Sequence, residues 1–242
     1  MLSIKNLEKY TNQFQTSIDN IVREYCQHLF LSYLYQEPGS EKLLFKGGTA
    51  LRIVFESPRF SEDLDFSGFN IRYTEIEKIL TNTLSNIEKS GLMIDITESK
   101  QTSGSYLAIL IFKIEEYITK IQIEISLRGG KQMVGTRTII RNDFIPAYTL
   151  VHLPTDDLVG QKIEALLDRK KPRDFFDYYY LLSGNHAIAK NKKNLQTIIV
   201  LLEQSKIDFR NELRRFLPAS QARHMKDFRK ILIDKINTYI GK

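Results

Sequence analysis

Hydrophobic positions recur with recognisable periods along the first third of the chain. Residues 4–36 carry apolar side chains at helical spacing and predict one long helix. It is expected to end at residues 37–39, Glu-Pro-Gly, which break helices. The apolar run at residues 43–45 predicts a short strand, and residues 49–55 predict one or two helical turns. A second strand is expected at residues 63–67.

The middle of the chain has the pattern of a sheet. Residues 73–90 predict an amphipathic helix that Gly91 closes. Three strand-like runs follow it, at residues 92–98, 105–114 and 118–127. The last of these runs alternates strictly between apolar and polar residues, as a strand with one buried face does. Residues 133–141 predict a further, weaker strand.

The C-terminal part of the chain has a helical pattern from residue 155 onward. Pro172 is expected to open a new helix, because its missing N–H does no harm at the first helical position. The aromatic run at residues 175–180 is expected to pack in the core. The predicted fold class is α+β: a small mixed β-sheet with an N-terminal helix before it and a helical C-terminal half after it. Residues 1–150 and 151–242 would form two parts with a cleft between them.

Composition narrows the class of protein and the kinds of site. With 242 residues, 42% of them apolar, the chain is long enough to bury a core. The single cysteine, Cys26, excludes an internal disulfide and a cysteine-type zinc site, and the four histidines are not at metal-ligand spacing. No apolar stretch is long enough to span a bilayer, and the N-terminus lacks a signal pattern. We therefore expect no membrane contact and a cytoplasmic location.

Positive charge is concentrated at the C-terminal end. Residues 186–242 contain 13 Lys and Arg against 5 Asp and Glu, whereas the first 185 residues have a net charge of −2. This asymmetry favours an anionic partner such as RNA or DNA. A solvated helical surface is the alternative.

Three acids stand in four positions within the segment RFSEDLDF, residues 59–66. In a strand, Asp63 and Asp65 would share one face while Leu64 and Phe66 share the other. Two carboxylates side by side suit Mg²⁺ or Mn²⁺, which take oxygen ligands. The alternative is an exposed turn in which the acids have no specific role.

Gly47 and Gly48 follow the expected strand at residues 43–45 and precede the helical turns that begin at Thr49. Glycines in this position allow backbone N–H groups to approach phosphate oxygens, and the helix dipole favours the negative charge. One element would then hold a triphosphate and the next its metal ion. The two motifs together are much more specific than either alone.

A metal site for nucleotidyl transfer usually has a third carboxylate. Glu124 is the acid on the polar face of the strictly alternating run, and with Asp63 and Asp65 it would hold two metal ions roughly 4 Å apart. Alternatively, Glu124 pairs with a neighbouring lysine on the sheet surface. The other candidates for the third ligand are Asp95, Glu115 and Glu116.

Residues 156–182 form a second segment dense in charge. Lys162 is a candidate to contact a triphosphate, and Arg173 is a candidate for a bidentate contact with phosphate or carboxylate. Asp174 and Asp177 are one helical turn apart, and Arg173 reaches Asp177 at i,i+4 spacing. A structural ion-pair network is equally favoured for Arg173 and Asp177. For Lys162 and Asp174 a functional role is favoured.

The motifs KGGTAL, RFSEDLDF and QKIEALLDRKKPRDFFDYYYL together resemble the AbiEii/AbiGii family of abortive-infection toxins. They run from Lys46 to Leu182, somewhat over half of the chain. The family belongs to the nucleotidyltransferase superfamily with the polymerase-β-like fold. The resemblance implies an NTP-dependent transferase that acts with Mg²⁺ and is paired with a cognate antitoxin.

The resemblance also implies roles for individual residues and for the two parts of the chain. It gives the phosphate-binding turn to Gly48 and Thr49, the metal site to Asp63 and Asp65, and a catalytic or nucleotide-contacting pair to Lys162 and Asp174. Residues 1–150 would be the nucleotidyltransferase core, and residues 151–242 would complete the active-site cleft.

The predicted activity is transfer of a nucleotide from an NTP to an RNA end, with tRNA the favoured acceptor and pyrophosphate the leaving group. Lys162 would steady the triphosphate, and Asp174 would position or deprotonate the acceptor. The basic C-terminal helices would bind the RNA backbone, so binding would weaken with salt. Three alternatives stay open: the same chemistry on a protein acceptor, a non-catalytic nucleotide- or RNA-binding module, and a metal-dependent nuclease.

Overall fold

The computed structural model describes residues 3–128, 133–184 and 186–240, and the chain divides into two compact units. The first, which we call the sheet unit, comprises residues 1–56 and 60–154. The second, the helical unit, comprises residues 57–59 and 155–242. Residues 57–59 therefore belong to the helical unit, and the chain returns to the sheet unit at Phe60. Phe60 is two residues before the first acid of the RFSEDLDF segment.

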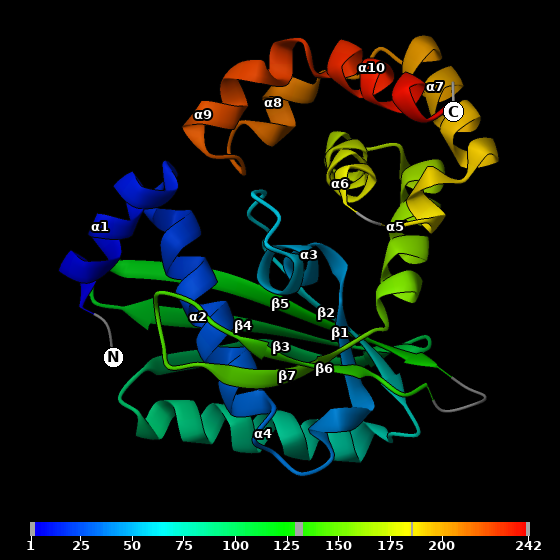
Figure 1. Cartoon of the computed structure of the whole chain (residues 1–242). Helices are drawn as coiled ribbons and strands as arrows, with labels where there is room; N and C mark the ends of the chain where they lie inside the picture. Colours follow the sequence, from blue (N-terminus) through cyan, green and yellow to red (C-terminus); the bar gives the residue numbers. More distant parts are fainter. Residues whose placement is uncertain (1–2, 129–132, 185, 241–242) are drawn as a thin grey trace. The chain divides into compact units, whose positions relative to one another are not determined.

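The sheet unit combines helices with one sheet (Figure 1). Its described elements are, in chain order, α1 (Ile4–Phe14), α2 (Ile18–Leu34), η1 (Ser40–Lys42), β1 (Leu43–Lys46), α3 (Gly47–Phe55), β2 (Leu64–Phe69), α4 (Tyr73–Lys89), β3 (Met93–Thr102), β4 (Ser105–Ile114), β5 (Tyr117–Arg128), β6 (Thr136–Ile140) and β7 (Tyr148–His152). The strand order is β3-β4-β5-β2-β1-β7-β6. Strands β2 and β5 are parallel, as are β1 and β7, and the other pairs are antiparallel. The predicted α+β class with a mixed sheet is confirmed.

Neighbouring rows across the sheet differ in character because successive side chains of a strand point to opposite faces. One row, from β1 through β2 and β5 to β4, consists of four buried aromatic and aliphatic side chains: Phe45, Phe66, Ile125 and Tyr106. Helix α4 lies along this face, and α3 lies on the other side of the sheet (Figure 1). The adjacent row points to the α3 side and consists of Lys46, Asp65, Glu124 and Leu107.

The prediction of one long helix over residues 4–36 is wrong, since α1 and α2 are separate. Gln15 adopts a left-handed conformation with φ of 52° and ends α1. The Ser17 Oγ atom then accepts a hydrogen bond from the Asn20 backbone N–H at 3.4 Å, which caps α2. Both helices bury apolar side chains, including Leu7, so the helical periodicity continues across the break and conceals it.

The predicted middle strands are confirmed as β3, β4 and β5, with β3 extending further, to Thr102. The weaker strand predicted at residues 133–141 is found as β6. Strand β7 was not predicted. It has five residues and is paired with β1 through Phe45 and His152, two residues far apart in sequence, so local periodicity gave little sign of it.

The helical unit contains α5 (Thr155–Arg169), α6 (Pro172–Ser183), η2 (Ile188–Lys190), α7 (Lys192–Gln204), α8 (Phe209–Leu213), α9 (Ala219–Ala222), η3 (Arg223–Lys226) and α10 (Phe228–Ile240). Pro172 opens α6 as predicted. Phe175 and Phe176 are buried, and the Phe175 and Phe209 rings pack edge to face with centroids 5.6 Å apart. Within the described ranges, no helix is both long and apolar enough to cross a membrane.

Candidate active site

The turn between β1 and α3 touches the carboxylate of Asp65. Gly47 is the first residue of α3 and has φ of +82°, a conformation that favours glycine. A Cβ atom at Gly47 would overlap Oδ2 of Asp65 and would lie only 2.8 Å from its Cβ and Cγ. The lack of a side chain at position 47 therefore allows the carboxylate to lie against the backbone. The glycine motif and the acidic motif are in direct contact.

Asp65 lies between a lysine and a glutamate in the sheet. Lys46 on β1 and Glu124 on β5 are its register partners, so the three side chains share one row and one face. Neighbouring strands are about 4.8 Å apart, which brings the carboxylates of Asp65 and Glu124 near enough to share a cation.

The pairing of residues between β2 and β5 also distinguishes Glu124 from the other candidates for a third ligand. Asp95 is on β3, which β4 separates from β5, and its carboxylate pairs with Lys113. Glu115 and Glu116 lie in the turn between β4 and β5. Of these four described acids, Glu124 is the one that pairs with Asp65.

Lys46 was not among the predicted site residues, although it begins the motif KGGTAL. Its Nζ atom donates a hydrogen bond to Ser126 Oγ at 3.3 Å. Burial and the nearby charge of Arg128 lower the pKa of the Lys46 ammonium group, while Asp65 and Glu124 act in the opposite direction. Its position directly before Gly47 and Gly48 is the sequence signal that would have found it.

Two buried side chains hold the backbone that leads into β2. Gln27 on α2 donates hydrogen bonds from Nε2 to the carbonyl oxygens of Ser61 and Glu62, both at 3.0 Å. The hydroxyl of Thr49 on α3 donates to the carbonyl oxygen of Asp63. Three consecutive carbonyl groups are therefore fixed from two helices. The Thr49 hydroxyl is used for this contact, so the part of Thr49 in binding a phosphate stays a prediction.

The donors brought together by the sheet fit a hard cation. Asp65 and Glu124 supply carboxylate oxygens from adjacent strands, and the Asp65 carboxylate lies where a Cβ atom of residue 47 would otherwise be. Mg²⁺ is commonly held by one or two carboxylates, with phosphate oxygens and water completing its shell. Among the described residues, no group of three or more His, Cys, Asp or Glu side chains is gathered to hold a metal ion. The three-carboxylate site with Asp63 therefore stays a prediction.

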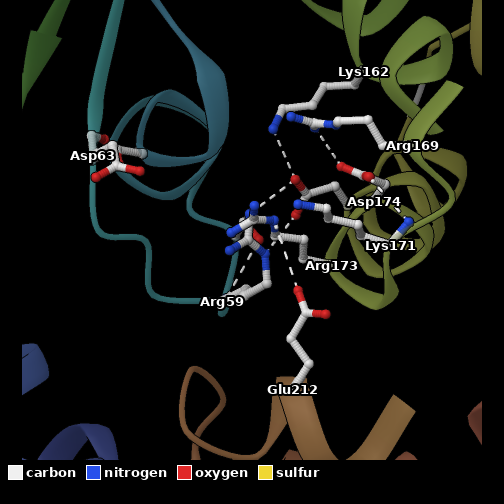
Figure 2. Close-up of polar contacts among 11 residues, drawn as sticks. Arg59, Asp63, Lys162, Arg169, Lys171, Arg173, Asp174 and Glu212 are labelled. Atoms are coloured by element: carbon white, nitrogen blue, oxygen red, sulfur yellow. Dashed lines mark hydrogen bonds and ion pairs between the residues drawn. The ribbon is translucent and has the colours of Figure 1, made fainter. Parts of the chain in front are cut away.

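A buried ion-pair network lies in the helical unit (Figure 2). Asp177 on α6 accepts hydrogen bonds from Arg59 Nε at 2.7 Å, from the second Arg59 nitrogen at 2.9 Å and from Lys162 Nζ at 2.8 Å. Burial raises the pKa of Asp177, but the charges and hydrogen bonds of Arg59 and Lys162 outweigh it and lower the pKa to about 2. This network is structural, and sequence reasoning missed its arginine because Arg59 is remote from α6 in sequence.

The predicted pair between Arg173 and Asp177 is wrong. Arg173 Nε lies 3.7 Å from Glu212 Oε1 (Figure 2). Asp177 instead pairs with Arg59 and Lys162. The i,i+4 spacing permits the pair, but a buried guanidinium that binds both carboxylate oxygens is a stronger partner than a half-exposed one. The predicted contact of Arg173 with a nucleotide is untouched by this correction.

Asp174 has two partners at the start of α6. Its Oδ2 accepts a hydrogen bond from the Lys171 backbone N–H at 3.3 Å, and its Oδ1 accepts one from Arg169 at 2.6 Å (Figure 2). The side chain is almost fully buried and caps the helix. Lys162 and Asp174, for which a functional role was favoured, thus both have structural contacts. Their catalytic roles stay predictions.

The family model of the nucleotidyl transferase AbiEii toxin, from type IV toxin–antitoxin systems, matches residues 29–237. The chain belongs to the AbiEii family. The match begins within α2 and ends within α10, so it extends well beyond the motifs between Lys46 and Leu182. Membership of the AbiEii family makes the chain a nucleotidyltransferase toxin and sets aside the non-catalytic binding module.

Solved structures with a similar fold include a nucleotidyltransferase toxin and a protein from Helicobacter pylori. MenT4, a nucleotidyltransferase toxin from Mycobacterium tuberculosis, has 15% identity and a TM-score of 0.63, with 98% of this chain and 90% of that chain covered. JHP933 from Helicobacter pylori has 17% identity and a TM-score of 0.56, with 92% and 95% covered. At these low sequence identities, the two solved structures show only that their fold is similar to that of this chain. Among curated proteins, none matches the sequence.

Replacement of Gly47 by alanine is expected to abolish most activity, because the new Cβ atom must displace the Asp65 carboxylate. Gly104→Ala is the matched control: Gly104 also has a positive φ, +80°, but a Cβ atom there meets nothing within 4 Å. Both variants should lose about 1–2 kcal/mol of stability from backbone strain. Nucleotide transfer should fall at least about tenfold in Gly47→Ala alone. Equal activity of the two variants would contradict the importance of the contact.

The Thr49 hydroxyl can be tested with a pair of variants at one position. Thr49→Val keeps the shape but removes the donor to the Asp63 carbonyl, at a stability cost of about 1–3 kcal/mol. Thr49→Ser keeps the donor. We expect Thr49→Val to need a higher Mg²⁺ concentration for half-maximal activity and Thr49→Ser to restore the wild-type value. Mg²⁺ titrations of the two variants that coincide would argue against a positioning role.

The pH dependence of stability should report on Asp177. Its pKa is lowered from 3.8 to about 2 in the folded protein, so its stabilising effect is complete above pH 3.8 and is lost as the pH falls toward 2. Asp177→Asn leaves the buried Arg59 and the partly buried Lys162 without a carboxylate and should cost about 3–5 kcal/mol at neutral pH. Urea unfolding should show this difference shrinking below pH 4. The exposed-site variant Asp234→Asn should follow the wild-type profile, and a constant difference for Asp177→Asn would refute the assignment.

Proposed function

We propose that the protein transfers a nucleotide from an NTP to an RNA acceptor in the presence of Mg²⁺ or Mn²⁺, with tRNA as the first acceptor to test. The observation that carries this proposal is the contact between the Gly47 backbone and the Asp65 carboxylate, together with the pairing of Asp65 and Glu124. A turn suited to phosphate and a pair of carboxylates suited to a metal ion are adjacent, as an NTP with its bound cation requires.

The backbone N–H groups at the start of α3, from Gly47 to Thr49, would bind phosphate oxygens, and the helix dipole would favour the negative charge. Lys46 adds a positive charge beside this turn. Asp63, Asp65 and Glu124 would hold the cation, which supplies neutralisation of charge on the phosphates and polarisation of the α-phosphate when it is bound.

The reaction proposed is an in-line displacement at the α-phosphorus. A hydroxyl oxygen of the acceptor forms the new bond to phosphorus, and its proton passes to the Asp174 carboxylate or to water. The bond between the α-phosphorus and the α,β-bridging oxygen breaks, and pyrophosphate leaves with the electron pair. The residues of the sheet unit orient the triphosphate and exclude competing geometries, which is the main contribution that proteins make to this chemistry.

The charged segment of residues 156–182 would contribute cations and a carboxylate to the reaction. We assign Lys162 and Arg173 to the triphosphate and Asp174 to the positioning or deprotonation of the acceptor. Because Lys162 donates to the buried Asp177, its charge is partly balanced already. Lys162 would therefore act as a shared cation. Loss of Lys162 should then affect both stability and nucleotide affinity.

The proposed antitoxin and acceptor are inferred from the family and from the distribution of charge along the chain. Membership of a type IV toxin–antitoxin family implies a cognate antitoxin, and the reaction on cellular RNA implies a cytoplasmic location. The excess of basic residues after residue 186 supports an RNA acceptor, whose binding would weaken with salt. A protein side chain is the second candidate acceptor, since its hydroxyl could attack the same phosphorus atom.

The decisive experiment incubates the protein with Mg²⁺, total tRNA and each of the four α-labelled NTPs in turn. Label is expected on tRNA with one or more NTPs, and Glu124→Gln should lower the rate by at least about a hundredfold, in line with the loss of a charged group at such a site. Glu88→Gln, an exposed change on α4, is the control and should retain the rate. Label on protein would redirect the acceptor assignment. No transfer to either acceptor would contradict the proposal.

A further inference from the structure

Helix α3 contacts the acidic segment, residues 60–65, at three points. Near the start of the helix, Gly47 lies against the Asp65 carboxylate, and Thr49 donates a hydrogen bond to the Asp63 carbonyl oxygen. The third contact lies further along the helix and involves the beginning of the segment. The contacts therefore run antiparallel, because each step forward along α3 is a step back along the segment. The helix whose first turn would bind phosphate is also the helix that lies against the acids.

Arg52 makes the third contact. The central carbon of its guanidinium group lies 4.1 Å from the centre of the Phe60 ring, and Phe60 is buried. The same carbon lies 5.7 Å from the centre of the Phe14 ring on α1. A planar guanidinium can stack on an aromatic ring, whereas an ammonium group has no plane to stack. Because Phe60 comes three residues before Asp63, Arg52 fixes the start of the segment whose end carries the carboxylates.

Glu24 of α2 fixes the orientation of this guanidinium group. Its Oε1 atom accepts a hydrogen bond from Arg52 Nε at 3.0 Å, and its Oε2 atom accepts one from Arg52 Nη2 at 3.1 Å. Burial raises the pKa of the Glu24 carboxyl group, and Arg52 offsets part of this effect. Apolar residues of the same volume are often as stabilising as a buried ion pair, so stability alone does not account for this one.

We propose that Arg52 is a positioning residue for nucleotide transfer. Held by Glu24, its guanidinium fixes Phe60 and thereby keeps the acidic segment in place beside the turn at Gly47. This inference rests on the proposed function and adds a residue that acts without touching the metal ion or the NTP. Carboxylates and a phosphate turn that are held in one geometry let a metal ion and a triphosphate bind more tightly together than apart.

The first test removes the ring and leaves the ion pair intact. Phe60→Leu keeps an apolar side chain, and Phe112→Leu is the matched control because Phe112 on β4 is also buried and points to the α4 side of the sheet. The α,β-methylene analogues of the four NTPs are titrated in turn, and the analogue that binds best is used. Its dissociation constant is measured in EDTA and in Mn²⁺. The ratio of the two constants measures how strongly the metal ion supports nucleotide binding.

Phe60→Leu should lower this ratio at least about fivefold, whereas the dissociation constant in EDTA should stay within about twofold of wild type, because the turn at Gly47 is unchanged. Phe112→Leu should retain both values. A wild-type ratio in Phe60→Leu would overturn the inference and leave nucleotide transfer intact. A ratio close to unity in the wild-type protein would overturn the metal assignment of the proposed function together with the inference.

The second test separates the plane of the guanidinium from its charge. Arg52→Lys keeps a cation beside Glu24 but cannot stack on Phe60. The Mg²⁺ concentration for half-maximal transfer should rise at least about fivefold, while kcat at saturating Mg²⁺ should stay within about twofold of wild type. Arg72→Lys makes the same change at an exposed site that pairs with Glu75 and should follow the wild type. Coinciding Mg²⁺ titrations of the two lysine variants would overturn the inference.

Discussion

The contact between the Asp65 carboxylate and the backbone of Gly47 is the constraint on which the sheet unit depends. It requires a residue without a side chain at position 47 and requires β1 and β2 to pair so that Lys46 lies opposite Asp65. That register in turn places Asp65 opposite Glu124, because β2 also pairs with β5. One close approach of side chain to backbone therefore couples the turn at Gly47 to both carboxylate-bearing strands.

Local patterns in the sequence predicted much of this arrangement. The strict alternation of residues 118–127 fixes the face of Glu124, and the glycines before Thr49 mark the start of α3. The contacts that depend on distant segments could not be predicted. Gln27 reaches the carbonyls of Ser61 and Glu62 from α2, and nothing in the periodicity of a helix reveals which buried polar side chain will meet which carbonyl. Strand β7 was not predicted for the same reason, because it pairs with the distant strand β1.

The charged residues of α6 show that spacing in the sequence does not by itself identify ion-pair partners. Arg173 and Asp177 have the spacing of an ion pair, yet Asp177 takes Arg59 and Lys162 as partners. A buried carboxylate needs charged, hydrogen-bonded partners, since removing one from water costs several kcal/mol. Arg173, a half-exposed neighbour one turn away, does not supply them, because its guanidinium faces Glu212. The partner comes instead from residues 57–59, which belong to the helical unit although the acidic motif follows at once in the sheet unit.

Like charges in RFSEDLDF are tolerated because their surroundings offset them. Asp65 is half-exposed, which leaves it partly hydrated, and the Lys46 ammonium group lies beside it. Burial and the charge of Arg128 lower the pKa of Lys46, and the two carboxylates offset only part of this effect. The backbone before Asp65 is fixed by side chains of α2 and α3, so repulsion cannot be relieved by a shift of the strand. Carboxylates that are held close together and only partly compensated attract a further cation. In the proposed function, the same rigidity would let this row bind a divalent ion together with a triphosphate.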